Sequence, residues 1–169
     1  RVEYLADKNG MNMTNEEIAL LGVALFLSAK VLGTLICGKL FDQVHFMQYR
    51  ITLNLLMLVS IIVYFHSTTL IGVAIGTILG GIAMGGASLA WNLWVTKLSP
   101  LGRESEYMGV HVALTGIRGT TAPFMGYLLL EPFGFSGVSI LPASLIFLAT
   151  ILFATTLKNS RFSTHEFKN

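Results

Sequence analysis

One stripe of polar side chains runs along an apolar segment and could bind a solute. Residues 107–130 read YMGVHVALTGIRGTTAPFMGYLLL, which is long enough to cross a bilayer, yet Arg118 stands near the middle. An ionisable residue at membrane depth is tolerated where it faces a water-filled cavity or a partner. At about 100° per residue, Tyr107, His111 and Thr115 fall on the same stripe as Arg118. We therefore expect this segment to line a solute pathway.

Lys30 is a second cation inside an apolar run. Two cations facing a midplane cavity suit an anionic substrate, or acids supplied by another part of the protein. Lys30 can instead snorkel towards the membrane interface. His111 could carry a proton, because histidine titrates near physiological pH, or it could form an ordinary packing hydrogen bond. Asn92 lies between Trp91 and Trp94 and is a further cavity candidate.

The composition indicates an integral membrane protein. Hydrophobic residues make up 53% of the 169 residues and charged residues only 12%, against roughly 25% in an average soluble domain. The net charge of +2 and the lack of a basic tract give no support for nucleic-acid binding. The single Cys37 provides neither a disulfide nor a metal site, and no metalloprotease or phosphate-loop motif occurs. We expect no metal, no cofactor and no enzymatic activity.

Five apolar runs predict an all-α, polytopic membrane protein with helices over residues 18–37, 47–65, 70–97, 106–130 and 137–157. Residues 1–17 form a polar, extracytoplasmic lead-in and residues 158–169 a polar tail. An outside start without a signal sequence predicts that an upstream span is missing. The positive-inside rule places the C-terminus in the cytoplasm of a cell (inner) membrane. Seven basic residues support that side and two the other: Lys39, Arg50, Lys97, Arg103, Lys158, Arg161 and Lys168 against Arg1 and Lys8.

Glycines recur at helical spacing in two of the expected spans. Small residues allow membrane helices to approach closely, so such rows predict packing faces. One row repeats every four residues in the third span, and the fourth span carries further glycines with a proline. The expected packing residues are Gly72, Gly76, Gly80, Gly109, Gly116, Pro123 and Gly126.

The connection after the first span begins Gly38-Lys39-Leu40-Phe41-Asp42. This G-x-x-x-D pattern resembles the cytoplasmic loop motif of the major facilitator superfamily. The family pattern continues with basic residues and a glycine, whereas this chain continues Gln43-Val44-His45-Phe46-Met47 and has Arg50 as a displaced basic residue.

A second resemblance lies in the fourth span, where Gly109, Pro123 and Gly126 match the glycine-proline spacing of the family's fifth and eleventh helices. Arg118, Ala122 and Tyr127 replace the other glycines. The order of spans, with a Pro100/Arg103 loop before the proline-bearing span, resembles one six-helix half without its first helix. The C-terminal half fits better than the N-terminal half, which stays the alternative.

The resemblance implies a secondary transporter that moves a small solute by alternating access, with a missing N-terminal half of the same chain as partner. Gly38 and Asp42, with Arg50 and Arg103, would form the cytoplasmic latch, and the Gly72/Gly76/Gly80 and Gly109/Gly116 faces would be sliding contacts. Arg118, His111 and Lys30 would lie on the substrate side. The rival interpretations are a non-transporting sensor or assembly module with the same fold, and an intramembrane enzyme.

Overall fold

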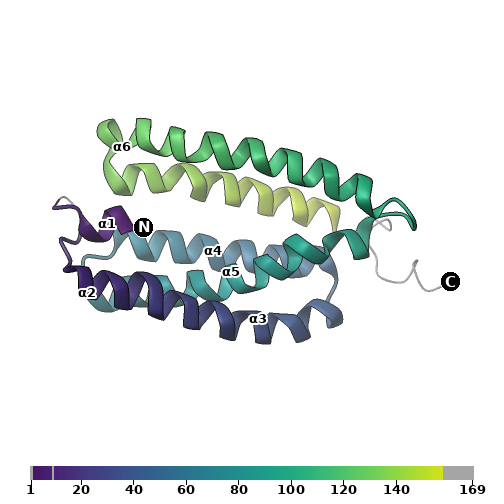
Figure 1. Ribbon diagram of the computed structural model, residues 1–169, viewed down its shortest axis with the longest axis horizontal. Coiled ribbons are helices and arrows are strands. Elements are labelled where there is room, and N and C mark those ends of the chain that lie inside the picture. The colour runs from purple at the N-terminus through teal and green to yellow at the C-terminus, as the bar shows by residue number, and fades with distance from the viewer. Residues whose placement is uncertain (1, 9, 158–169) are drawn as a thin grey trace.

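The computed structural model describes residues 2–8 and 10–157, and these residues form an elongated helical bundle (Figure 1). No strand occurs in these two ranges, so the all-α prediction is confirmed. Arg1, Asn9 and the expected tail at 158–169 lie outside the described residues. The elements are α1 (Val2–Ala6), α2 (Asn15–Ile18), the π-helical η1 (Ala19–Leu25), α3 (Phe26–Gln43), α4 (Phe46–His66), α5 (Leu70–Leu98) and α6 (Glu104–Thr156).

The first long rod is continuous from Asn15 to Gln43, because α2, η1 and α3 follow one another without a break. A capping box fixes its start. The Thr14 hydroxyl accepts a hydrogen bond from the Glu17 amide at 3.3 Å, and the Glu17 carboxylate accepts one from the Thr14 amide at 2.9 Å. These two bonds satisfy amide groups that the first turn of a helix leaves without partners.

Helix α6 reverses direction at Gly134, whose φ of 63° and ψ of −179° are not helical. Glycine is favoured at such a positive φ because it has no Cβ. The reversal divides α6 into two antiparallel arms, residues 104–133 and 135–156, which lie side by side at the top of Figure 1. The sequence predicts a loop over residues 131–136, but helix continues on both sides of this one glycine.

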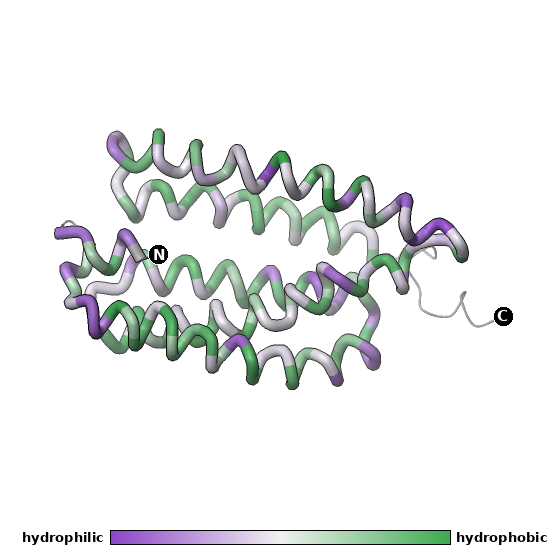
Figure 2. The backbone as a smooth tube through the Cα atoms, in the orientation of Figure 1, coloured by the Kyte–Doolittle hydropathy of each residue, from purple (hydrophilic) through white to green (hydrophobic). Residues whose placement is uncertain are grey.

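Four helices are long and apolar enough to cross a membrane, and the fourth of them contains both arms of α6. Their outer surfaces are apolar: Leu35 on α3 is 65% exposed and Ile71 on α5 is 73% exposed. Hydrophilic residues gather mainly at the two ends of the bundle (Figure 2). An apolar outer surface made only of helices is compatible with the hydrocarbon core of a bilayer, because each helix satisfies its own backbone hydrogen bonds there.

Glycines bring α5 into backbone contact with α3 and α4. A Cβ added at Gly81 would lie 2.7 Å from the Ala29 Cβ, and one added at Gly85 would meet the Lys30 carbonyl oxygen on α3. On the other side of α5, a Cβ at Gly76 would lie 2.8 Å from the Tyr64 backbone nitrogen. The core of the bundle is therefore a close-packed group of three helices.

Two buried hydrogen bonds join α4 to α5 at well-separated heights. Ser60 donates to the Gly76 carbonyl at 2.8 Å, and the Tyr49 hydroxyl donates to the Gly86 carbonyl at 3.0 Å. The glycines expose their carbonyls to a neighbouring side chain because they carry no side chain of their own. Polar groups thus fix the register of two otherwise apolar helices.

The expected packing role of the glycines holds only for some of them. Gly76 packs against α4 and Gly80 is buried, whereas the missing Cβ of Gly72 faces Ser67 in the preceding turn. Added Cβ atoms at Gly109, Gly116 and Gly126 would meet nothing within 4 Å. No described helix covers that side of the first arm, so the packing role of these three glycines stays a prediction about a contact with another part of the protein. Pro123 is likewise exposed.

Candidate functional site

The tryptophans of α5 face the polar stripe on the first arm of α6. The His111 ring centroid lies 4.1 Å from that of Trp91 and 5.3 Å from that of Trp94. Tyr107 lies 6.5 Å from Trp94, and the Arg118 guanidinium carbon lies 5.2 Å from the Trp91 ring centroid. The stripe predicted from helical spacing thus lies against two aromatic rings, which we name the tryptophan pair.

Thr115 lies between two members of the stripe, but its hydroxyl is already bonded. Oγ1 donates to the His111 carbonyl of the same helix at 2.7 Å. Back-bonding of this kind satisfies a hydroxyl inside a membrane helix without a neighbour. Thr115 therefore contributes to the stripe chiefly through its place beside His111 and Arg118.

Arg50, the displaced basic residue of the G-x-x-x-D pattern, joins this cluster from α4. Helix α4 begins at Phe46, so Arg50 stands one turn inside it and is half-buried. Its guanidinium carbon lies 5.7 Å from the ring centroid of Phe153 on the second arm of α6. Arg50 and His111 line one cavity together with Trp91, and Arg118 lies over the Trp91 ring.

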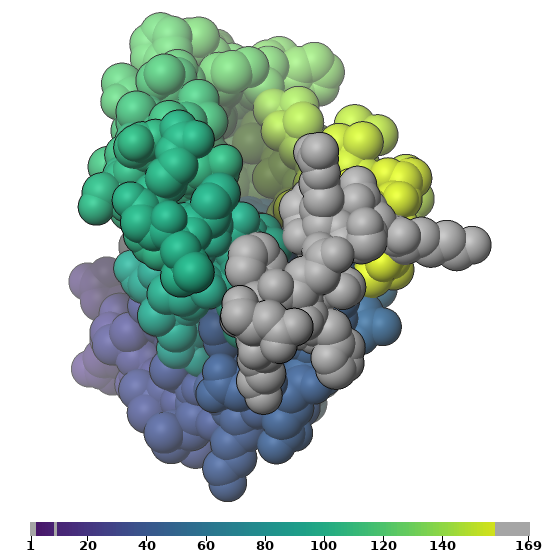
Figure 3. Space-filling view, turned by 90° about the vertical axis from the view of Figure 1, so that its right-hand side faces the viewer, coloured from purple at the N-terminus to yellow at the C-terminus, as the bar shows by residue number. Residues whose placement is uncertain are grey.

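Two adjacent cavities open at this cluster and share Trp94 and His111 in their walls. The larger, of about 380 Å³, lies beside the first turns of α6, and the smaller, of about 240 Å³, lies between Arg50, the tryptophan pair and Phe153. Nε1 of Trp94 and Nε2 of His111 are buried and make no hydrogen bond with the described residues. Figure 3 views the bundle from this end, with the arms of α6 above the α3–α4 turn.

An exposed ion pair borders the larger cavity. The Arg103 guanidinium binds the Glu106 carboxylate at 2.6 Å, and it is the single salt bridge among residues 2–8 and 10–157. Both side chains are about 60% exposed, at 59% and 62%. Pairs of this kind contribute about 0–1 kcal/mol, so the pair orders the mouth of the cavity more than it stabilises the fold.

Two candidates from the sequence stand apart from the cluster. Lys30 belongs to α3, which lies on the opposite side of the bundle from α6, with α4 and α5 between them (Figure 1). Asn92 is exposed, lines neither cavity and donates from Nδ2 to the Ser88 carbonyl at 2.7 Å. The structure therefore does not bring Lys30 or Asn92 to the site formed by Arg118 and His111.

The G-x-x-x-D motif is helical rather than a loop. Gly38 and Asp42 lie in the last turns of α3, and only Val44 and His45 separate α3 from α4. Asp42 is exposed and forms no ion pair with any residue of the described ranges. The connection expected between the spans at 18–37 and 47–65 is therefore much shorter, because α3 continues through polar residues to Gln43.

Lys97 makes the contact that ties this end of the bundle together. Its Nζ donates to the Phe41 carbonyl in the last turn of α3 and lies 4.4 Å from the Phe41 ring centroid. A cation at a helix C-terminus satisfies an unpaired carbonyl and complements the helix dipole. No spacing in the sequence indicates this contact, since 56 residues separate the partners.

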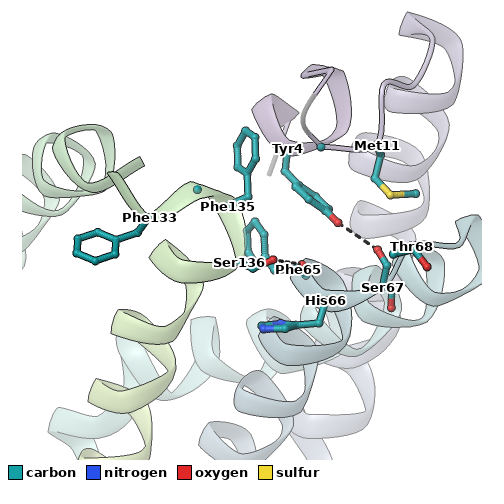
Figure 4. A pocket seen from close by; sticks show the side chains of 11 residues that line it. Tyr4, Met11, Phe65, His66, Ser67, Thr68, Phe133, Phe135 and Ser136 are labelled. Atoms are coloured by element: carbon teal, nitrogen blue, oxygen red, sulfur yellow. Dashed lines mark hydrogen bonds between the residues drawn. The ribbon is translucent and has the colours of Figure 1, made fainter. Parts of the chain in front are cut away.

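A third cavity, of about 590 Å³, lies at the other end of the bundle (Figure 4). The Tyr4 hydroxyl donates to the Ser67 carbonyl at 3.1 Å, and Ser136 donates to the Phe65 carbonyl at 3.1 Å. The Tyr4 ring lies 5.3 Å from that of Phe135, and burial raises the pKa of the Tyr4 phenol. These contacts hold α1 and the reversal of α6 on the end of α4.

Within the described ranges, no three histidine, cysteine or acidic residues gather where they could hold a metal ion. The acids of the first arm lie near its ends, at Glu104, Glu106 and Glu131, while Asp42 lies in the last turn of α3. Among the described residues of the first arm, the ionisable groups at the depth of His111 and Arg118 are therefore basic, and they lie beside the tryptophan pair. Such a site can attract and hold an anion.

Apolar rods with an aromatic, cation-lined site between them define a multi-pass membrane protein of the transporter class. A family model described as Major Facilitator Superfamily matches residues 3–169. The chain belongs to this superfamily, whose members are membrane transporters that bind small-molecule substrates, and its bundle is part of one six-helix half. No curated protein and no solved structure matches the chain.

Proposed function

We propose that the chain is part of a secondary transporter that moves a small organic anion by alternating access. The observation that carries this proposal is that two arginines border one aromatic cluster, because Arg50 lines the smaller cavity with Trp91 and Arg118 lies over the Trp91 ring, and neither forms an ion pair within the described chain. Bringing like charges together away from bulk water is unfavourable unless an opposite charge compensates. A transported anion supplies that charge each time the site is loaded.

The rest of the transport path is proposed to come from a second six-helix half of the same chain. In alternating access, two halves rock about a site between them, so each half presents one polar face to the other. The open side of the first arm, with Gly109, Gly116 and Arg118, is available for this role. Gly38, Asp42 and Arg103 stand at one end of the described bundle and are proposed to latch the halves there.

The proposed orientation places that end in the cytoplasm of a cell (inner) membrane. Lys39, Lys97 and Arg103 all lie at the end where α3 meets α4 and α5 meets α6. An excess of basic residues marks the cytoplasmic side of membrane proteins. The same orientation makes the C-terminus cytoplasmic.

Uptake into proteoliposomes tests the proposal. The full-length transporter is reconstituted, and initial rates are measured for labelled succinate, lactate and benzoate, with Arg118→Ala compared to the unaltered protein. We expect uptake of at least one anion to fall about tenfold or more, equivalent to about 1.4 kcal/mol. Lys8→Ala removes an exposed cation at the other end and serves as the control.

Unchanged uptake of every transported anion by Arg118→Ala would remove Arg118 from the site. Binding of anions without any uptake by the unaltered protein would instead favour the sensor or assembly module. The two results are distinguished by measuring equilibrium binding on the same preparation.

A further inference from the structure

The smaller cavity has walls suited to a flat ring and, beside them, groups suited to a negative charge. Aromatic rings come from three elements, with Phe46 on α4, the tryptophan pair on α5 and Phe153 on the second arm of α6. Arg50 and His111 complete the lining. Aromatic walls bury flat apolar ligands by offset or edge-to-face contact, and a few polar groups then fix the orientation.

Two polar atoms of this cavity lack a partner. Nε1 of Trp94 is a donor only, and it is buried without a hydrogen bond to any described residue. Nε2 of His111 is in the same condition on the same wall. A buried donor without an acceptor is costly, so Nε1 of Trp94 points to a ligand that supplies an acceptor oxygen.

Arg50 provides the charge for such a ligand. Its guanidinium is half-buried over Phe153 and has no ion pair in the described chain. A planar guanidinium binds a carboxylate through two parallel hydrogen bonds, which a point-like cation does not match. Arg50 and Trp94 line the same cavity, so a carboxylate bound there has a guanidinium and an indole N–H as candidate partners.

We propose that this cavity binds a small aromatic carboxylic acid, with its carboxylate on Arg50 and Trp94 Nε1 and its ring among Trp91, Trp94 and Phe153. This inference rests on the proposed anion transport and names the substrate class. A purely inorganic anion would leave the aromatic walls without contact, and a neutral ring would leave Arg50 uncompensated. The cavity of about 240 Å³ has room for a single ring with small substituents.

Equilibrium binding of labelled benzoate to the purified full-length protein in lipid nanodiscs tests this inference. Competition with benzamide, which keeps the ring without the charge, and with acetate, which keeps the charge without the ring, separates the two requirements. We expect benzoate to bind at least tenfold more tightly than either competitor. Lys8→Gln, which removes a charge far from the cavity, is expected to bind benzoate as the unaltered protein does.

Three substitutions identify the groups that hold the carboxylate. Arg50→Gln is expected to weaken benzoate binding about tenfold or more, and Arg50→Lys to weaken it less, because the charge remains. Trp94→Phe keeps a ring but removes the donor, and is expected to weaken benzoate binding about tenfold. Trp91→Phe is the matched substitution at a tryptophan whose indole N–H is not buried without a partner. It is expected to weaken benzoate binding less than Trp94→Phe does.

Equal binding of benzoate and benzamide, or of benzoate and acetate, would overturn the inference, as would benzoate affinity unaffected by Arg50→Gln. Failure of benzoate to bind the unaltered protein would do the same. The transport proposal fails separately. Benzoate that binds as expected but is not taken up supports this inference against that proposal, whereas Arg118-dependent uptake of another anion without benzoate binding overturns this inference and leaves transport standing.

Discussion

The guanidinium of Arg118 lies over the face of Trp91, 5.2 Å from the ring centroid. The face of an indole is the negative part of its quadrupole and attracts a cation. Arg118 is exposed in the described bundle, so Trp91 is the neighbour that holds it on the side of His111 and the two cavities. Trp91, on the close-packed helix α5, thereby positions the charge of Arg118 on the more exposed first arm of α6.

Replacing Trp91 by leucine removes the aromatic face and keeps an apolar side chain. A cation–π contact at an exposed site contributes about 0.5–1 kcal/mol, so we expect anion uptake to fall roughly two- to fivefold. Trp91→Phe retains a weaker face and should lie between Trp91→Leu and the unaltered protein. Initial uptake rates in proteoliposomes measure this, and equal rates for leucine and tryptophan at this position would contradict it.

Gly85 and Gly116 should respond in opposite ways to the same substitution. A Cβ at Gly85 would meet the Lys30 carbonyl oxygen, so Gly85→Ala forces α3 and α5 apart and should lower the free energy of unfolding by about 1–3 kcal/mol. Gly116→Ala meets nothing within 4 Å and should raise helix stability by up to about 1 kcal/mol. Thermal unfolding in detergent measures both.

A large loss of stability for Gly116→Ala would show that another segment closes against the first arm of α6. The same measurement on detergent-solubilised monomers would then locate the contact. A loss that persists in monomers places the contact within one chain, and a loss seen only in nanodiscs places it between molecules.

Lys97→Met should loosen the end of α3. The substitution removes the hydrogen bond to the Phe41 carbonyl and the cation over the Phe41 ring, and we expect a loss of about 1–2 kcal/mol of stability at the α3–α4 turn. Faster proteolysis near Val44 measures this directly. Lys39→Met removes an exposed cation from the same region and should leave the cleavage rate unchanged.

Alkaline pH should weaken the anchoring of α1. Burial raises the pKa of Tyr4 above the ordinary tyrosine value of about 10, so the folded state keeps its proton to higher pH than the unfolded state. The stability from this group is therefore fully present below about pH 10 and is lost as the pH rises through the raised pKa. Protease accessibility of α1, followed from about pH 8 to about pH 11, should rise at the alkaline end.

Tyr4→Phe cannot ionise and should lack the alkaline component of this rise. It also loses the hydrogen bond to the Ser67 carbonyl, so its accessibility should be higher than that of the unaltered protein at neutral pH. An unchanged alkaline profile in Tyr4→Phe would assign the effect to another group.

The sequence predicts those features of the site that depend on one helix. Tyr107, His111 and Arg118 share a side of α6 because helical spacing alone decides it. Arg50 was missed as their neighbour, because 68 residues and a change of helix separate it from Arg118, and no local pattern encodes that distance. Lys30 shows the converse: sequence indicates how deep a charge lies in a span but not which neighbour it faces.

Local sequence patterns do not fix where a helix ends or which of its faces packs against a neighbour. Polar residues at Gly38–Asp42 suggest a loop, yet they extend α3 beyond its apolar part, since helices need not end where hydrocarbon does. Glycine spacing favours close packing in α5 and in α6 alike, but only α5 has helices on both sides. A row of glycines identifies a helix face that another helix can approach closely. Whether a helix packs there depends on which helices the fold places beside it.

Both tryptophans of the 169-residue chain stand together at the cation cluster, within 6 Å of the same histidine ring. Indole emission from the native protein is therefore a local signal rather than an average over the molecule. A solute that enters either cavity, or a displacement of Arg118 from the Trp91 face, alters the surroundings of these two fluorophores directly. The protein thus carries an intrinsic optical probe at the place where its cargo is proposed to bind, without any label.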